Sequence, residues 1–111
     1  MLNKGLIIRK EWLNKIFHEG KVYEMRSSNT KVRGLIGLIE AGSGMIYGEC
    51  NLKSSRRLTN EEYISCFEKH KVSDISLLSK WSYAWELEDV LLYEDPIPYN
   101  HKRGAVIWVN L

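Results

Sequence analysis

The sequence predicts an α+β fold: a partly closed β-barrel of about five to six strands, with two to three helices at its ends. Three observations predict it. The chain has 111 residues, which leaves room for a single domain over residues 1–111 with one modest core. Its apolar segments come in the order strand, helix, three strands, helix, two strands. Most connections between strands are of hairpin length, which favours an antiparallel or mixed barrel.

The amino-terminal segment predicts a strand that leads into a helix. The apolar run at residues 6–8 is typical of a buried strand. In the segment that follows, four apolar residues fall on one helix face: Trp12, Leu13, Ile16 and Phe17. Gly20 then supplies a residue that readily takes the left-handed conformation in which many helices end.

Three strands follow. Residues 22–26 alternate, with Tyr23 and Met25 on one face and charged Glu24 and Arg26 on the other. Residues 34–39 and 45–52 predict two strands of a hairpin, joined by a turn around the glycines at 42 and 44. We therefore expect one charged strand face in the first half of the chain.

A second helix is predicted to begin at Thr59 and to run to about Lys69. Thr59 and Glu62 form the pattern of a capping box, in which each side chain bonds to the other residue's backbone N–H. Three residues are expected to face inward from this helix: Tyr63, Ile64 and Phe67. His70, at its end, is predicted to act as a favourable charge near a helix C-terminus.

The last third of the chain predicts mostly strand. Residues 71–82 indicate a loop with one helical turn, and residues 83–93 a long strand. The two prolines predict a turn over residues 96–99, and residues 105–109 predict the final strand.

Composition excludes several classes of protein. No apolar run approaches the roughly 20 residues that span a bilayer, and the amino end lacks a signal peptide, so we expect a cytoplasmic protein. Cys50 and Cys66 form no Cys-x-x-Cys motif and are predicted to be ordinary buried thiols. No phosphate-loop motif, metal-ligand spacing or nucleophile elbow is present, and we predict no metal or cofactor.

Charge is spread unevenly along the chain. Residues 1–57 hold eleven Lys or Arg and five Asp or Glu, whereas residues 58–111 hold five and nine. This asymmetry favours a polyanionic partner.

Several motifs together resemble the ASCH domain family, within the PUA-like group, over nearly the whole chain. They are residues 6–12, the box Gly20-Lys21-Val22-Tyr23-Glu24-Met25-Arg26, residues 33–36 and 48–49, Tyr83-Ala84-Trp85, and residues 98–108. The resemblance implies a PUA-like barrel with a cleft beside the box that binds RNA or nucleotides.

Some relatives in this family are small amidohydrolases that deacylate acetylated cytidine, and others are ribonucleases. In the amidohydrolase type a Lys and a Thr of the box are catalytic, with a downstream Glu. The resemblance carries these roles to Lys21, and to Glu68 for the downstream Glu, but Glu24 stands at the Thr position. Amide hydrolysis by the same mechanism is in doubt because a carboxylate does not replace a hydroxyl nucleophile.

The box has its own predicted chemistry. Glu24 and Arg26 share one face of the strand predicted over residues 22–26, and Lys21 stands one residue before that strand. In a cleft, the two cations would hold phosphate and Glu24 would accept a hydrogen bond from a base or ribose hydroxyl. Burial would tune Lys21 and Glu24 toward acid–base work. The alternative is a surface ion pair.

Six further residues are candidate contacts to a nucleic acid or nucleoside: Arg56, Arg57, Tyr83, Trp85, His101 and Arg103. The two aromatics point to one strand face and would stack unpaired bases. The basic residues would contact phosphate, and the histidine would exchange a proton near neutral pH. The alternatives are core packing for the aromatics and solvated positions for the charged side chains.

Three functions remain open. The first is a module that binds single-stranded RNA or a modified nucleoside. The second is a small hydrolase in the same cleft, either an amidohydrolase on acetylated cytidine or a metal-independent ribonuclease, with Lys21 and Glu24 handling protons. The third is a protein-interaction module whose aromatics dock a partner. The oligomeric state is not predicted.

Overall fold

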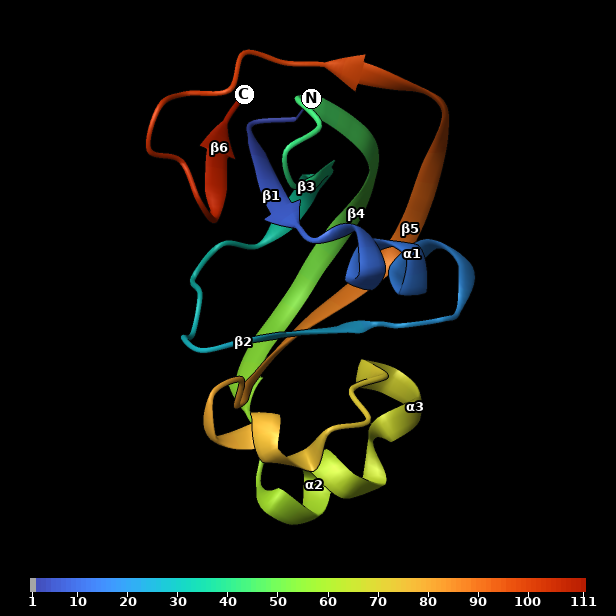
Figure 1. Cartoon of the computed structure of the whole chain (residues 1–111), viewed down its shortest axis with the longest axis vertical. Helices are drawn as coiled ribbons and strands as arrows, with labels where there is room; N and C mark the ends of the chain where they lie inside the picture. Colours follow the sequence, from blue (N-terminus) through green and yellow to red (C-terminus); the bar gives the residue numbers. More distant parts are fainter. Residues whose placement is uncertain (1) are drawn as a thin grey trace.

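A curled, mixed β-sheet is the frame of the computed structural model, which describes residues 2–111 (Figure 1). Within these residues the sheet has six strands in the order β2-β5-β4-β3-β1-β6. The strands are β1 Lys4–Ile8, β2 Tyr23–Arg26, β3 Gly34–Glu40, β4 Met45–Arg57, β5 Tyr83–Pro98 and β6 Trp108–Asn110. Strands β1 and β3 are parallel and the other neighbours are antiparallel, which gives the predicted half-barrel.

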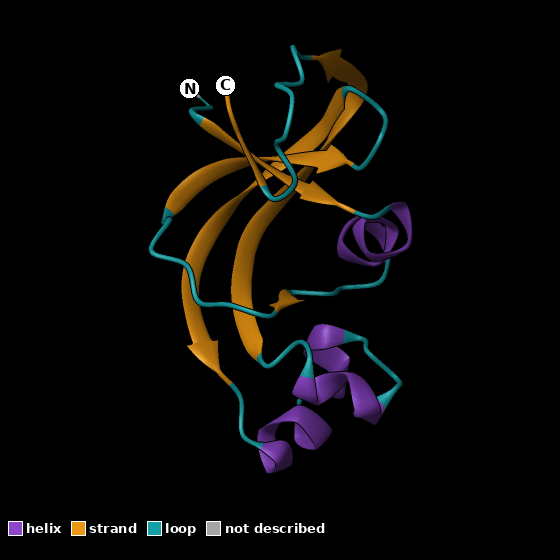
Figure 2. Cartoon of the chain, turned by 60° about the vertical axis from the view of Figure 1, so that its left-hand side comes forward, coloured by secondary structure: helices purple, strands orange, loops and turns teal. Residues whose placement is uncertain are grey.

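Short helices lie beside the curled sheet and beyond one of its ends (Figure 2). They are α1 Lys10–His18, α2 Asn60–Ser65, α3 Phe67–His70 and the 3₁₀ turn η1 Ile75–Ser79. The predicted α+β class and the predicted helical turn within residues 71–82 are therefore confirmed. No helix within residues 2–111 has the length and apolar character needed to cross a membrane.

Helix α1 packs its apolar face on the sheet. Leu13 and Ile16 are buried in one core cluster with Leu38 and Trp85 of the strands. Phe17 of the same helix packs against this cluster and is partly buried. The helix is therefore held by the amphipathic pattern that predicts it.

A glycine lets α1 approach the sheet closely. A Cβ atom at Gly48 would lie 2.3 Å from the carbonyl oxygen of Leu91 and 2.8 Å from the Phe17 ring. The first contact is with backbone, which cannot move aside as a side chain can. Gly48 therefore sets the spacing between β4, β5 and α1.

The predicted second helix is broken into two. Thr59 and Glu62 make both hydrogen bonds of the capping box, which confirms the predicted start. The helix stops at Cys66 and resumes as α3. Ile64 lies before this break, one residue round the helix from the buried Tyr63, and Phe67 begins α3. They are 62% and 41% exposed, and their predicted inward orientation was wrong.

The predicted turn at residues 96–99 is instead part of β5. Met45 pairs with Pro98, and Ile46 pairs with Ile97. Strand β2 pairs with β5 only over Tyr83–Glu86. The second half of β5 therefore has no strand paired to that edge within residues 2–111. Proline is tolerated at such an edge because no ladder hydrogen bond is lost there. The last strand is also shorter than predicted and begins at Trp108.

We predict that Gly48→Ala lowers the free energy of unfolding by about 1–3 kcal/mol or more, because the added methyl group forces β5 and α1 outward. Lys53→Ala, an exposed change on the same strand, should alter it by less than about 0.5 kcal/mol. Chemical denaturation of both variants measures the difference. Equal stabilities would mean that the close approach at Gly48 does not constrain the fold.

Candidate functional site

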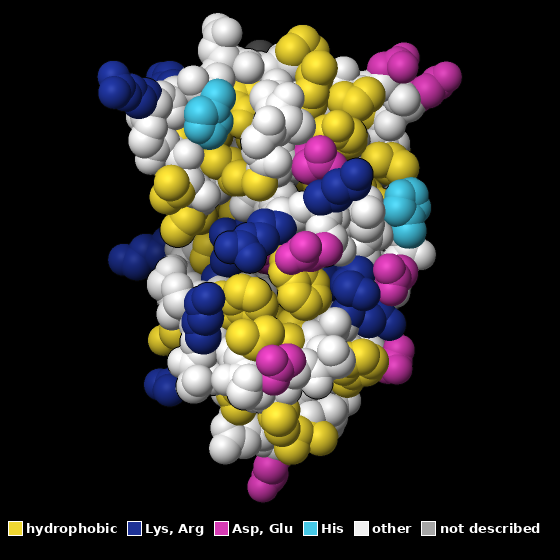
Figure 3. Space-filling view, in the orientation of Figure 1, with side chains coloured by type: hydrophobic (Ala, Val, Ile, Leu, Met, Phe, Trp, Pro, Cys, Tyr) yellow, Lys and Arg dark blue, Asp and Glu magenta, His cyan; other side chains and the backbone are white. Residues whose placement is uncertain are grey.

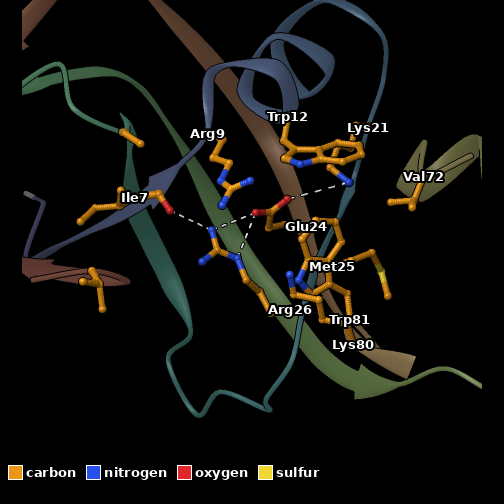
Figure 4. A pocket seen from close by; sticks show the side chains of 12 residues that line it. Ile7, Arg9, Trp12, Lys21, Glu24, Met25, Arg26, Val72, Lys80 and Trp81 are labelled. Carbon is orange, nitrogen blue, oxygen red and sulfur yellow. Dashed lines mark hydrogen bonds and ion pairs between the residues drawn. The ribbon is translucent and has the colours of Figure 1, made fainter. Parts of the chain in front are cut away.

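A pocket of about 320 Å³ opens beside the box residues, and Lys21, Glu24 and Arg26 all line it (Figure 4). Lys21 and Glu24 are buried and Arg26 is half-buried. Strand β2 brings the last two together, and the turn before β2 supplies the lysine. The structure therefore places the three box residues at one concave site.

The Arg26 guanidinium joins the two sides of the curled sheet. Its Nε and Nη2 atoms lie 3.0 and 2.9 Å from Oε2 of Glu24, and Nη2 also donates to the Ile7 carbonyl oxygen at 2.8 Å. Ile7 lies on β1, whereas Arg26 lies on β2 at the far end of the sheet order. A side chain thus bridges the open seam of the half-barrel.

The Glu24 carboxylate has one anchored and one free oxygen. The side chain is 6% exposed, and Oε2 is held by the guanidinium of Arg26. Oε1 lies 3.8 Å from Nζ of Lys21, which is beyond hydrogen-bond range. Within residues 2–111 Oε1 accepts no hydrogen bond, yet it is not among the fully enclosed unpaired atoms. It is therefore available to a ligand in the pocket.

Lys21 is buried as a cation at the back of the site. Its Nζ donates to the carbonyl oxygens of Tyr23 at 2.6 Å and His70 at 2.5 Å, and lies 5.0 Å from the Trp12 ring centre. Burial lowers the pKa of Lys21 from 10.5 to about 8. The Glu24 charge opposes this shift of the pKa, while nearby cations reinforce it. Lys21 consequently titrates close to neutral pH.

His70 supports Lys21 and is itself neutral. The ring is 1% exposed and stacks on Tyr63 at 4.3 Å. Its Nδ1 accepts from the Val72 N–H at 2.9 Å, so Nε2 is the nitrogen that donates to the Tyr63 carbonyl at 2.6 Å. Burial also lowers the pKa of His70. The predicted role as a charge at a helix end was wrong, because the end of α3 turns inward.

Two tryptophans form apolar walls of the pocket. Trp12 comes from α1, and Trp81 from the segment after η1. Their rings meet edge to face with centroids 5.9 Å apart. Nζ of Lys80 lies 5.3 Å from the Trp81 ring centre, and Lys80 also lines the pocket. Sequence reasoning assigned neither Trp81 nor Lys80 to the site, because both fall in the segment where its pattern was ambiguous.

Arg9 is a further pocket residue that sequence reasoning missed. It directly precedes α1, and Figure 4 shows its guanidinium directed toward Glu24 and Arg26. No acidic side chain within residues 2–111 forms an ion pair with it. The feature of the sequence that could have indicated Arg9 is its place as a basic residue between an apolar strand and the first helix.

Trp85 lies beneath the site instead of facing it. The side chain is 2% exposed, its indole N–H donates to the Ser28 carbonyl at 2.9 Å, and its ring stacks on Trp108 at 5.7 Å. The Arg26 guanidinium lies 5.5 Å from the Trp85 ring centre. Tyr83 pairs with Arg26 across the two strands but does not line the pocket. Trp85 thus supports Arg26 and has no ring face open for a base.

The candidates from the second half of β4 and from α3 lie away from the pocket. Glu68 is exposed on α3 and pairs with Lys71 at 3.0 Å. Arg56 pairs with Glu62 at 2.5 Å, and Arg57 is exposed at the end of β4. None of the three candidates lines the pocket. The position of Glu68 therefore does not match that of a carboxylate acting with Lys21.

The segment between β5 and β6 reaches the pocket through one apolar residue. Val106 lines it, whereas His101 and Arg103 do not. His101 is exposed, with Nδ1 2.9 Å from the Tyr99 hydroxyl, and Arg103 is exposed.

Charged side chains gather on the face that holds the pocket. In Figure 3, Lys and Arg side chains lie across the middle of the molecule, with hydrophobic side chains above and below them. Four cationic residues line the pocket, against Glu24 as the one carboxylate among its described lining: Arg9, Lys21, Arg26 and Lys80. The site combines aromatic walls, excess positive charge and one fixed acceptor.

A family model described as the ASCH domain matches residues 6–97. No curated protein sequence matches the chain. Among solved structures, ASCH from Zymomonas mobilis is similar at a TM-score of 0.69, with 13% identity over 97% of this chain and 86% of that one. Two point mutants of that protein match at a TM-score of 0.68, with 13% identity over 97% of this chain and 88% or 87% of theirs. At this identity the structural likeness shows the fold alone.

We predict that Lys21 makes stability rise in alkaline solution. Between about pH 8 and 10 the native chain has released a proton that the unfolded chain still holds, so the free energy of unfolding increases with pH. Relative to Lys21→Met, the wild type should gain about 2–3 kcal/mol between about pH 7 and 10.5. Denaturation of both proteins across this range measures the gain. A constant difference between them would show that Lys21 keeps its ordinary pKa in the folded chain.

Proposed function

The chain belongs to the ASCH domain family, and from this premise we propose that it binds single-stranded RNA or a modified nucleoside in the pocket beside β2. The observation that carries the proposal is the meeting of two tryptophans and four cations around one oriented carboxylate. Aromatic rings and basic side chains are the groups that proteins use to hold unpaired bases and phosphates.

The size of the pocket supports a single nucleotide unit as the ligand. Its volume of about 320 Å³ lies at the lower end of small-molecule sites, and the lining is partly apolar. A base inside a double helix could not enter such a concave site without leaving its stack, which costs free energy. The proposal therefore favours an unpaired nucleotide over a duplex.

In this proposal, the Glu24 carboxylate is the group that recognises the base. Arg26 fixes Oε2, so the carboxylate is oriented before a ligand arrives, and Oε1 remains an acceptor. A carboxylate oxygen pairs with the exocyclic amino group of cytosine or adenine, whereas uracil has no such donor. Bases with an amino group should therefore bind better than uracil.

A hydrolase acting in the same pocket is the second candidate. It is favoured by the lowered pKa of Lys21, about 8, and by the 3.8 Å between its Nζ and Oε1 of Glu24. Groups that titrate near the working pH are suited to proton transfer. The substrates would be acetylated cytidine or RNA, cleaved without a metal. A binding module remains the first proposal, because no hydroxyl nucleophile stands at residue 24 and Glu68 lies outside the pocket.

The proposal predicts that binding depends on the charge of Lys21. Labelled single-stranded RNA and acetylated cytidine are titrated with the chain at low salt, in the presence of a chelator. RNA affinity should fall by about fivefold to tenfold in Lys21→Met, and in the wild type as the pH rises through about 8, where the cation is lost. The variant should lose this pH dependence.

Lys102→Gln, which removes an exposed lysine outside the pocket, is the matched control and should bind as the wild type does. Equal RNA binding by Lys21→Met and the wild type would reject the pocket as the binding site. Product formation that disappears in Lys21→Met would establish the hydrolase instead. If neither ligand binds or reacts, both candidate functions fail.

A further inference from the structure

We propose that the pocket is built for a nucleotide with a terminal phosphate monoester, held by Arg9 and Lys80, and that it discriminates against a neutral nucleoside. This inference rests on the proposed function and narrows its ligand class. The same chemistry occurs in a free mononucleotide and at a phosphorylated RNA end.

The pocket carries an excess of positive charge. Four cationic side chains and one carboxylate line it, so positive charges outnumber negative ones by three among the described lining residues. Like charges placed together in a partly enclosed site repel one another and favour an anionic ligand.

The four cations of the pocket differ in whether they already have partners within residues 2–111. Nζ of Lys21 already donates to two backbone carbonyls. Arg26 is engaged by Glu24 and by the Ile7 carbonyl. By contrast, Arg9 and Lys80 form no ion pair with any residue from 2 to 111. Both are exposed, so their charged groups can reach a ligand at the mouth of the pocket.

Different residues of the pocket are suited to the base and to the phosphate of a nucleotide. The tryptophans and Glu24 offer apolar and hydrogen-bonding contacts suited to a base, while Arg9 and Lys80 come from the two segments that precede Trp12 and Trp81. A phosphate monoester carries about 1.5 to 2 negative charges at pH 7 and offers three acceptor oxygens, whereas an internal diester carries about one charge. The two cations that form no ion pair, in a pocket with an excess of positive charge, are better matched by the monoester.

The experiment compares cytidine, 5′-CMP and 3′-CMP for binding to the full chain, by calorimetry at fixed low salt. The wild type should bind at least one of the two nucleotides about tenfold more tightly than cytidine. In the double variant Arg9→Gln, Lys80→Gln the ratio of nucleotide to cytidine affinity should shrink to about twofold or less. Lys102→Gln should keep the full preference. Because the monoester loses charge near about pH 6, the preference should also weaken on acidification.

Each result separates this inference from the proposed function. Equal affinity for cytidine and both nucleotides would overturn the inference and leave nucleoside binding intact. A preference that survives in the double variant would overturn the roles of Arg9 and Lys80. Inorganic phosphate that competes as strongly as the nucleotides would overturn the nucleotide assignment. If no nucleoside or nucleotide binds, the proposed function falls with it.

Two cytidine oligonucleotides, one with a 5′-phosphate and one with a 5′-hydroxyl, then distinguish the two sources of the monoester. Tighter binding of the phosphorylated oligonucleotide than of the free nucleotide identifies an RNA end. Tighter binding of the free nucleotide identifies a mononucleotide. Binding of both oligonucleotides with equal affinity, above that of the free nucleotides, would overturn recognition of a terminal phosphate.

Discussion

The contact between Arg26, Glu24 and the Ile7 carbonyl is the constraint on which the fold and the site both depend. A carboxylate that is almost wholly buried is costly unless it is paired and hydrogen-bonded, and the guanidinium supplies both an opposite charge and a hydrogen bond to Oε2. Because the same guanidinium reaches β1, the pair also ties β2 to the far side of the curled sheet. The cluster of Arg26 and Glu24 thus connects the two sides of the half-barrel and also lines the pocket.

Burial of this cluster explains the chemistry of its neighbours. Lys21 takes two backbone carbonyls as partners and has a pKa of about 8, chiefly because burial removes its charged group from water. One of those carbonyls belongs to His70, and burial of the His70 ring lowers its pKa. Replacing a buried ionic cluster with apolar residues is often neutral or stabilising, so fold stability alone gives little reason for this one. The ligand binding proposed above would give this arrangement a function.

The sequence predicted well those features of the structure that depend on residues close together in the chain. The helix face of Leu13 and Ile16 and the capping box at Thr59 depend on short-range spacing, and both were confirmed. The residues 21, 24 and 26 lie together because they adjoin in sequence. Arg9, Lys80 and Trp81 reach the same pocket only through the packing of α1 and the segment after η1, which no local pattern encodes. The free edge of β5 that admits its prolines is likewise a property of the assembled sheet.

A double-mutant cycle on the free energy of unfolding, with Glu24→Gln, Arg26→Met and both together, tests most directly whether the charged pair closes the half-barrel. Each single change leaves a buried partner without its counterpart, so each should destabilise the chain, and the double variant should lose less than the sum. The account predicts a coupling of about 1–3 kcal/mol between the two residues. Additive losses, within about 0.5 kcal/mol, would contradict it.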